Sequence, residues 1–336
     1  MRPGQILPAS RSEEMGETMT HCGDDILSVV VCTRNRGADA VAAVRSLLAS
    51  AHPAFEVVVV DQSSDDATRQ ALAPLLADER LRYVGSRTAG LSRARNEGLA
   101  VARGAVVAMT DDDCEAAPGW LADVAQVFAG DPAVAAAFFS VRPGPHDPAA
   151  GVIPHHIFAA DRRMASVAAW RRTGQRTMGL GAAMAVRRAP ALQLGGFDPQ
   201  LGAGAPLQSA EDLDLPLRLL LDGYTVACSA QSHVVHHGLR TWPETKRLYY
   251  GYSVGPMATY AKLLRGGDMR FLAFFFEDIW REIVLDALRA VARRQRPRVL
   301  GRLRGMAAGF VRGMMMPLGQ GRRFADGAAT AKGSKA

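Results

Sequence analysis

Four short apolar runs alternate with helix-like segments in the N-terminal part of the chain. The runs cover residues 28–32, 56–60, 81–84 and 105–109. Apolar runs that lack polar alternation are typical of strands buried on both faces. Strands that alternate with helices form a parallel sheet with helices on both sides. The sequence therefore predicts an α/β fold with a mostly parallel central sheet.

The segments between these runs carry apolar residues at helical spacing. We expect helices over residues 39–50, 66–76, 92–102 and 118–128, the third with Ser92 as its N-cap. Prolines recur between residues 142 and 178, which predicts a long loop or lid. Further along, Phe271–Arg293 carries apolar residues on one face and charges on the other, which predicts an amphipathic helix.

The composition is that of an ordinary soluble globular protein, with 48% hydrophobic and 22% charged residues in a chain of 336. No apolar run reaches the roughly 18 residues that suggest a membrane span. Residues 1–24 lack the apolar core of a secretory signal, so we expect a poorly ordered leader. The four cysteines form no CxxC pair, which argues against a zinc site or a disulfide framework and is compatible with a reducing cytosol.

The net charge of +7 comes from the C-terminal part of the chain. Ten arginines and no acidic residue lie between Asp286 and Asp326, and without them the chain has 30 basic against 33 acidic residues. A nucleic-acid-binding body would need a basic face of its own, so we expect no nucleic-acid partner. An amphipathic helix followed by arginines suits an anionic membrane surface, although the same helix could instead cover the core of its own domain.

Three adjacent carboxylates, Asp111, Asp112 and Asp113, directly follow the fourth predicted strand. Their mutual repulsion is unfavourable unless a positive charge lies between them. Mg²⁺ and Mn²⁺ take oxygen ligands and often bridge carboxylates to substrate phosphates. Open α/β sheets bind ligands at the carboxyl ends of their strands. The run therefore predicts a metal–diphosphate site, with a solvated acidic turn as the alternative.

Other polar residues also follow predicted strands or begin predicted helices. The first strand leads into Thr33 and Arg36 without a GxGxxG or GxxxxGK[ST] motif, so neither a dinucleotide site nor a P-loop is predicted. Asp61 follows the second strand and could accept a hydrogen bond from a nucleotide base. Arg95, near a helix N-terminus, suits phosphate or donor contacts, with a surface salt bridge as the alternative.

The order of the motifs closely resembles the family 2 glycosyltransferases of GT-A fold. The resemblance covers residues 26 to about 238. The matching segments are Thr33-Arg34-Asn35-Arg36, Val60-Asp61-Gln62-Ser63-Ser64-Asp65-Asp66, Ala94-Arg95-Asn96-Glu97-Gly98, Asp111-Asp112-Asp113, Pro118-Gly119-Trp120, Gly181-Ala182-Ala183-Met184, Arg187-Arg188, Gly195-Gly196-Phe197-Asp198 and Glu211-Asp212-Leu213-Asp214. The sequence departs from the commonest pattern at Gln62 and at Met109-Thr110. Neither change removes a group that the chemistry needs.

The resemblance implies an inverting transfer of a sugar from a nucleotide-diphosphate donor, with Mg²⁺ or Mn²⁺ as cofactor. It implies Asp212 as the catalytic base. We expect Glu211 and Asp214 beside it to bind the acceptor by holding a hydroxyl, with a position facing solvent as the alternative. The implied metal ligands are Asp113, Asp111 and His236, with His237 as the second choice for the histidine. The implied donor-binding residues are Thr33, Arg36, Asp61, Arg95, Asp111 and Asp112. Glycosyl transfer needs both a carboxylate that takes the acceptor proton and a positive charge at the leaving diphosphate.

The expected organisation has a GT-A domain over residues 25–245, with a donor half over 25–115 and an acceptor half over 116–245. A helical, arginine-rich extension over 246–325 and a disordered tail over 326–336 follow. We expect a cytoplasmic enzyme, peripheral on the inner face of the cell membrane, that uses a UDP-, GDP- or dTDP-linked donor and a saccharide or polyprenyl-linked acceptor. The alternatives are a sugar-phosphate nucleotidyltransferase, whose glycine-rich phosphate loop is missing here, and a non-catalytic membrane-associated binding module.

Overall fold

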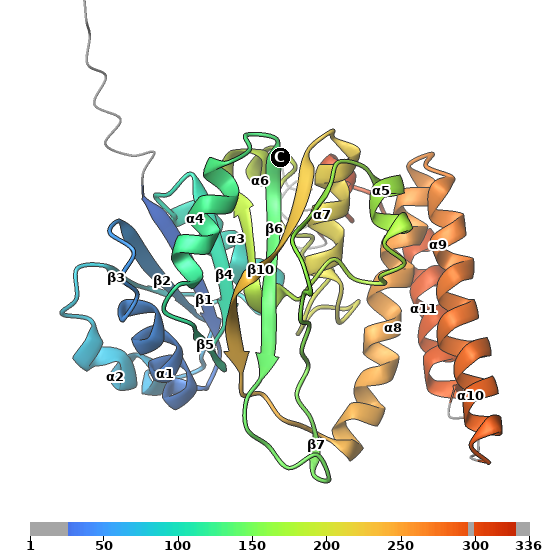
Figure 1. Ribbon diagram of the computed structural model, residues 1–336, viewed down its shortest axis with the longest axis horizontal. Helices are drawn as coiled ribbons and strands as arrows, with labels where there is room; N and C mark the ends of the chain where they lie inside the picture. Colours follow the sequence, from blue (N-terminus) through green and yellow to red (C-terminus); the bar gives the residue numbers. More distant parts are fainter. Residues whose placement is uncertain (1–25, 295–298, 327–336) are drawn as a thin grey trace, which may run out of the picture.

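The computed structural model describes residues 26–294 and 299–326. The predicted leader and all but the first residue of the predicted tail lie outside these ranges. Within them, the chain forms a central sheet flanked by helices, with a group of long helices at one end (Figure 1).

The central sheet has nine strands among the described residues. Their order is β3-β2-β1-β4-β9-β6-β10-β5, and β8 pairs with β10. The strands are β1 (Leu27–Thr33), β2 (Phe55–Asp61), β3 (Leu81–Gly85), β4 (Val106–Asp111), β5 (Cys114–Ala116), β6 (Val134–Pro143), β8 (Arg162–Met164), β9 (Met184–Arg187) and β10 (Thr225–His236). Strands β1 to β4 pair in parallel, as do β6 and β10, whereas β9 lies antiparallel between β4 and β6. The predicted α/β fold is confirmed, with β9 as an antiparallel insertion.

Helices cover both faces of the sheet because successive strand residues point to opposite sides. Val30 and Val58 belong to one hydrophobic core, and Val29 and Val57 belong to the other. The helices of the sheet domain are α1 (Gly37–Leu48), α2 (Ala67–Leu72), α3 (Leu91–Val101), α4 (Trp120–Ala129), α5 (Val167–Arg172), α6 (Arg188–Gln193) and α7 (Glu211–Leu221). Helices α3 and α7 pack into the first core, and α1 and α4 into the second.

Two local predictions need correction. Ser92 is not an N-cap, since α3 begins after Gly90 and the Ser92 hydroxyl donates to the carbonyl of Leu201 at 2.7 Å. The predicted loop over residues 142–178 contains the end of β6, then β7 (Gly151–Val152), β8 and α5. Strand β7 pairs with β11 (Arg240–Thr241) and so fastens this segment beside the carboxyl end of β10.

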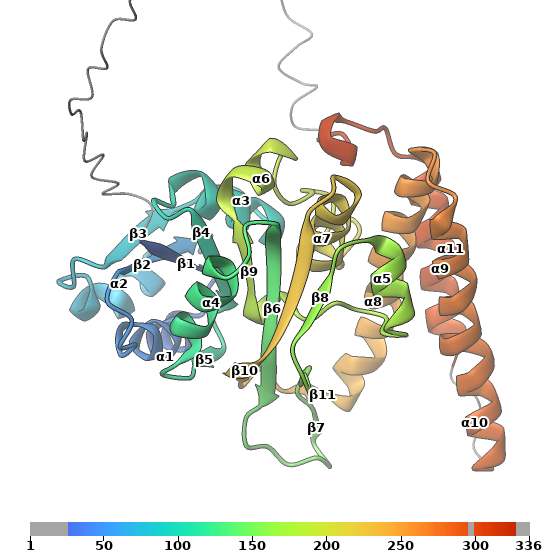
Figure 2. The same ribbon diagram turned by 45° about the horizontal axis from the view of Figure 1, so that its top comes forward.

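The C-terminal extension is a group of long helices beyond α7 (Figures 1 and 2). It contains α8 (Trp242–Arg265), α9 (Arg270–Ile279), a π-helical turn η3 (Trp280–Leu285), α10 (Asp286–Ala292) and α11 (Leu300–Met315). The predicted helix over 271–293 is thus confirmed, and α8 begins before the predicted boundary at residue 246. Helix α11 lies so close to α8 that a Cβ at Gly305, Gly309 or Gly313 would collide with the α8 backbone. No helix in the described ranges has the length and apolar character needed to cross a bilayer.

Candidate active site

The three acidic residues after β4 are held together by groups from the neighbouring strand β1. The Thr33 hydroxyl donates to Oδ2 of Asp112 at 2.8 Å. Nη1 of Arg36 lies 3.1 Å from carboxylate oxygens of both Asp112 and Asp113. Burial raises the pKa of Asp112 to about 6, although Thr33 and Arg36 act in the opposite direction. The structure thus places four of the predicted site residues side by side at the carboxyl ends of β1 and β4.

Asp113 also faces His236, the last residue of β10. Nε2 of His236 lies 3.2 Å from Oδ1 of Asp113, and Nδ1 lies 2.8 Å from the carbonyl oxygen of Pro154. Because a carbonyl only accepts, Nδ1 carries a proton, and Nε2 is the nitrogen directed at the carboxylate. Burial lowers the pKa of His236, but its hydrogen bonds to Asp113 and to the Pro154 carbonyl and the negative charges of Asp113 and Asp111 together outweigh burial and raise the pKa. His237 instead points to Glu115, at 3.4 Å.

These side chains fit a divalent cation. Ligand atoms of Asp113, Cys114 and His236 all lie within 4.8 Å of one another. A Cβ at Gly238 would collide with both Asp113 and Nε2 of His236, so the space beside these two groups depends on glycine. Burial raises the pKa of the Cys114 thiol well above its ordinary value, which leaves it a protonated thiol and a poor ligand. The carboxylate and the imidazole are the ligands that remain, and both suit Mn²⁺.

Arg95 of α3 joins the acidic run to the start of α7. Its Nη1 lies 2.9 Å from Glu211, and its Nη2 lies 3.2 Å from Asp111 and donates to the carbonyl of Gly181 at 3.1 Å. The side chain is only 2% exposed. The guanidinium of Arg95 thus positions Asp111 and Glu211, and a contact between Arg95 and the donor stays a prediction. Burial raises the pKa of Glu211 to about 7, with Asp212 acting in the same direction and Arg95 against it.

Asp212 lies in the first turn of α7 with one oxygen fixed and the other available. Its Oδ2 accepts a hydrogen bond from the Gly181 amide at 2.8 Å. Burial raises the pKa of Asp212, although Arg95 and the Gly181 amide lower it. Ala210, just before the helix, has a left-handed backbone with φ of 73°. Left-handed backbone is unfavourable for alanine, and such strain is concentrated at functional sites.

Two adjoining cavities meet at these residues. The first, of about 330 Å³, is lined by Thr33, Arg36 and the three acids after β4. The second, of about 440 Å³, is lined by Asp111, Glu211, Asp212 and His236, together with apolar residues such as Leu180 and Leu213. Asp111 and Arg240 line both cavities. One continuous space thus runs from the ends of β1 and β4 to the start of α7.

Asp61 lies at the end of β2 but outside the lining of these two cavities. Its Oδ2 accepts from the Tyr83 hydroxyl at 2.8 Å, and its Oδ1 accepts from the Ser63 amide at 2.8 Å and from the Ser63 hydroxyl. The neighbouring residue Gln62 does line the first cavity. A contact between Asp61 and a nucleotide base stays a prediction, and it would have to compete with these internal hydrogen bonds.

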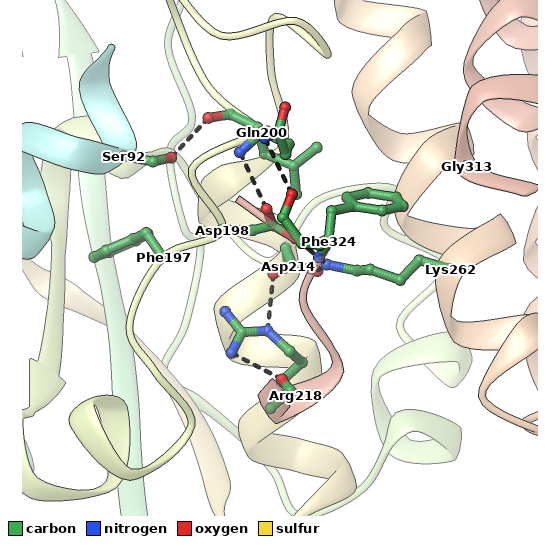
Figure 3. A network of polar contacts seen from close by, with 12 residues as sticks. Ser92, Phe197, Asp198, Gln200, Asp214, Arg218, Lys262, Gly313 and Phe324 are labelled. Carbon is green, nitrogen blue, oxygen red and sulfur yellow. Dashed lines mark hydrogen bonds and ion pairs between the residues drawn. The ribbon is translucent and has the colours of Figure 1, made fainter. Parts of the chain in front are cut away.

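Asp214 is not an acceptor-binding residue in this structure, which corrects the prediction from the sequence. It is fully buried and pairs with Arg218 at 2.8 Å and with Lys262 at 2.6 Å (Figure 3). Lys262 also pairs with Asp198, at 2.7 Å. The Asp214 carboxylate therefore belongs to a buried ion cluster made of Asp198, Asp214, Arg218 and Lys262, on the side of α7 that faces α8.

The C-terminal segment after α11 packs onto this buried ion cluster. The Phe324 amide donates to Oδ2 of Asp198 at 2.7 Å (Figure 3). Asp326 makes two hydrogen bonds with Arg93 of α3, at 2.7 and 2.8 Å. Helix α3 also carries Arg95. The residues at the end of the extension therefore help to hold this helix of the site in place and do not form a free tail.

Sequence reasoning missed several residues of the site, of which Arg240 is the clearest. It lines both cavities, and Nη2 lies 3.9 Å from Oδ2 of Asp113. Arg240 follows the predicted metal-ligating histidine segment by two residues after Gly238, and this closeness in sequence could have indicated a place in the site. Tyr252 and Pro256 of α8 also line the second cavity, and nothing in their local sequence indicates it.

The mixed sheet with acidic residues at the end of β4 is the architecture of a GT-A glycosyltransferase. Residues 28–193 match the model of glycosyl transferase family 2. The predicted resemblance is thus confirmed for this part of the chain, which is similar to family 2 glycosyltransferases.

Relatives and solved structures agree with this assignment. An uncharacterized glycosyltransferase of Rickettsia conorii is 30% identical over 108 residues, which are 32% of this chain and 18% of that protein. The succinoglycan biosynthesis protein ExoO of Rhizobium meliloti is 40% identical over 88 residues, 26% of this chain and 25% of its own. The chain thus spans a quarter or less of these two relatives.

Among solved structures, the mannosyltransferase PcManGT of Pyrobaculum calidifontis, in complex with GDP-Man and Mn²⁺, superposes with a TM-score of 0.59 at 19% identity. The match covers 86% of this chain and 87% of that one. Residues 1–349 of TarS from S. aureus give a TM-score of 0.54 at 16% identity, over 86% of this chain and 81% of that one. At these identities the likeness shows the fold.

Proposed function

We propose that this protein transfers a sugar, with inversion, from a nucleotide-diphosphate donor to a hydroxyl of a saccharide or lipid-linked acceptor. The observation that carries the proposal is the bridge made by Arg95 between Asp111 and Glu211. It joins the acids at the end of β4 to the start of α7, so that Asp111 and Asp212 border one cavity. Donor-binding groups and a candidate base thus share a single space.

Asp212 is the proposed general base. In a single displacement, its free oxygen takes the proton of the acceptor hydroxyl while that hydroxyl oxygen bonds to the anomeric carbon of the sugar. The bond from this carbon to the diphosphate breaks on the opposite face, and the nucleotide diphosphate leaves with the electron pair. The Gly181 amide fixes Oδ2 of Asp212 and so orients the carboxylate for this transfer.

A divalent cation, Mg²⁺ or Mn²⁺, would be held by Asp113 and His236, with Asp111 at the edge of the site. When bound, it would neutralise charge on the departing diphosphate. Arg36 and Arg240 lie beside the same acids and add positive charge on the donor side. The Nδ1 hydrogen bond to Pro154 keeps the His236 ring oriented.

The solved relatives support a nucleotide-sugar donor. PcManGT was solved with GDP-Man and Mn²⁺, and TarS with UDP and with UDP-GlcNAc. The likeness to ExoO supports a role in polysaccharide synthesis. We propose a UDP-, GDP- or dTDP-linked donor for this chain.

The proposal is tested by donor screening followed by a turnover assay. We expect one class of nucleotide sugar to raise the melting temperature of the protein in the presence of Mn²⁺. The same donor should release its nucleoside diphosphate when an acceptor is added. Release of pyrophosphate from a nucleoside triphosphate would instead indicate a nucleotidyltransferase. Binding with no turnover across a broad acceptor panel would favour a non-catalytic module.

Removing the metal ligands should abolish donor binding. Because Nε2 of His236 lies beside the Asp113 carboxylate at the acidic run, Asp113→Ala and His236→Ala should lose the Mn²⁺-dependent calorimetric signal with the donor. EDTA should have the same effect on the unsubstituted protein. His237→Ala is the matched control, since His237 points to Glu115, and it should bind normally. Full-strength binding in EDTA would contradict the metal assignment.

A further inference from the structure

The helix formed by α9, η3 and α10 has two apolar faces, and only one of them is covered. Phe271 and Phe274 are buried and stack with Tyr260, and Phe274 also stacks on Trp170. This face covers the core of the domain, which is one of the two alternatives that the sequence left open for this helix. The opposite face carries a stripe of exposed apolar side chains at helical spacing. They are Leu272, Phe276 (59% exposed), Trp280 (54%), Leu288 (57%) and Val291 (62%).

The start of α11 lies beside this helix and carries exposed apolar side chains of its own. Arg302 pairs with both Glu282 and Asp286, which places the beginning of α11 beside η3 and α10. Leu300 and Leu303 are exposed there, by 58% and 44%. Single exposed apolar residues are ordinary, but a continuous apolar surface marks a site of interaction.

The charges on this helix leave a positive surplus at its C-terminal end. Its four carboxylates are each engaged by arginine: Glu277 by Arg171, Asp278 by Arg176, Glu282 by Arg176 and Arg302, and Asp286 by Arg289 and Arg302. Arg293 and Arg294, at the end of α10, are exposed and make no ion pair with any described residue. The apolar stripe thus ends in uncompensated positive charge.

This end of the helix lies on the catalytic side of the molecule. Figures 1 and 2 show α10 reaching beyond the arrowheads of β6 and β10, the side on which parallel β4 also ends. Helix α10 therefore extends toward the side of the sheet at which β4 and the acidic run end.

We propose that the exposed face of α9, η3 and α10, with the start of α11, binds an anionic lipid bilayer. Exposed aliphatic and Trp side chains enter the boundary between headgroups and acyl chains, and arginines at the edge pair with anionic headgroups. A protein partner would need carboxylates placed opposite Arg293 and Arg294, whereas an anionic bilayer offers negatively charged headgroups at every point of its surface. The proposed membrane binding depends on no step of the proposed transfer reaction.

The charge component is tested with vesicle flotation and two matched double variants. Arg293→Gln with Arg294→Gln should lower partitioning onto phosphatidylcholine–phosphatidylglycerol vesicles by about tenfold or more at low salt. The control, Arg45→Gln with Arg69→Gln, removes the same charge from exposed sites in α1 and α2 and should bind like the unsubstituted protein. Binding should weaken as salt screens the arginines and should be lower on pure phosphatidylcholine.

The apolar component is tested with Leu288→Ser and Val291→Ser together, which should reduce binding even at low salt. Both residues are exposed, so the melting temperature should hardly change; if the variant misfolds, the arginine pair still decides the proposal. The proposal is overturned if the full chain does not float with anionic vesicles, or if the Arg293/Arg294 variant and its control bind equally. A third result would also overturn the proposal. If the protein does not bind vesicles, and if sedimentation shows a dimer that the Leu288/Val291 variant dissociates, the stripe joins two copies of this chain.

Discussion

Replacing Asp212 with asparagine should lower the turnover number by at least about 100-fold, the usual scale of general base catalysis. The substitution keeps the size of the side chain, and its amide oxygen can still accept from the Gly181 amide. What it removes is the ability to take the acceptor proton. The affinity for the donor should therefore stay nearly unchanged, as measured by calorimetry beside steady-state kinetics.

The pH profile of turnover gives an independent readout of the same base. Burial raises the pKa of Asp212, so the carboxylate that must accept the proton is lost as the pH falls through this raised value. Turnover should decline on the acid side accordingly, and the residual activity of Asp212→Asn should lack that decline.

A control for Asp212→Asn lies just after the end of the same helix. Asp222→Asn makes the same chemical change at an exposed position after the end of α7 and should leave turnover intact. Wild-type turnover in Asp212→Asn would place the base elsewhere. Glu211→Gln would then be the next variant to measure, since Glu211 borders the same cavity.

The sequence predicts the strand-end part of the site well because parallel strands bring their carboxyl ends to one edge. The β1–β4 register sets Cys32 opposite Asp111, so Thr33 and Arg36 necessarily fall near Asp112 and Asp113. The contact between His236 and Asp113 follows from the antiparallel pairing of β5 with β10, which sets His236 opposite Cys114. Only the family resemblance indicated this contact from the sequence.

The acceptor side could not be predicted in the same way because its residues come from helices and loops. Asp214 follows Asp212 by two positions, and on a helix such neighbours point in different directions. Asp212 consequently faces the cavity, and Asp214 faces the core. Arg95 looks like a surface arginine at a helix start, and only the packing of α3 against α7 turns it into a buried bridge. The left-handed Ala210 has no signal in the sequence, since glycine is the residue that normally marks such a backbone.

The arginine-rich end of the chain shows how composition alone can mislead. Ten arginines suggest a tail that can be removed. However, Arg302 lies in α11, and Arg323 lies in the segment beside the buried ion cluster. Deleting this region would also remove Phe324 and Asp326 from their partners Asp198 and Arg93. A truncation would therefore disturb the support of the site, which is why substitutions at exposed positions are the better test of membrane binding.

Replacing Lys262 with methionine should destabilise the protein by about 3–5 kcal/mol, the usual cost of stranding a charge in the interior. Lys262 is 1% exposed and pairs with Asp198 and Asp214, which are fully buried. Without it, Arg218 still pairs with Asp214, but Asp198 loses its buried ion pair with Lys262. Urea unfolding at neutral pH measures the loss. The control, Arg270→Met, breaks an exposed ion pair with Asp268 and should cost no more than about 1 kcal/mol.

A double variant separates loss of charge balance from loss of packing. Asp198→Asn combined with Lys262→Met restores neutrality in the buried ion cluster, because Asp214 and Arg218 remain as a pair. Groups in one ion-pair network couple by about 0.5–3 kcal/mol, so the double variant should be more stable than the sum of the two single losses predicts. Additive losses would show that Lys262 acts through its aliphatic stem instead. Asp198 also accepts the Phe324 amide, and an asparagine oxygen can still accept it, so a stable double variant would mean that this contact of the C-terminal segment needs no charge at residue 198.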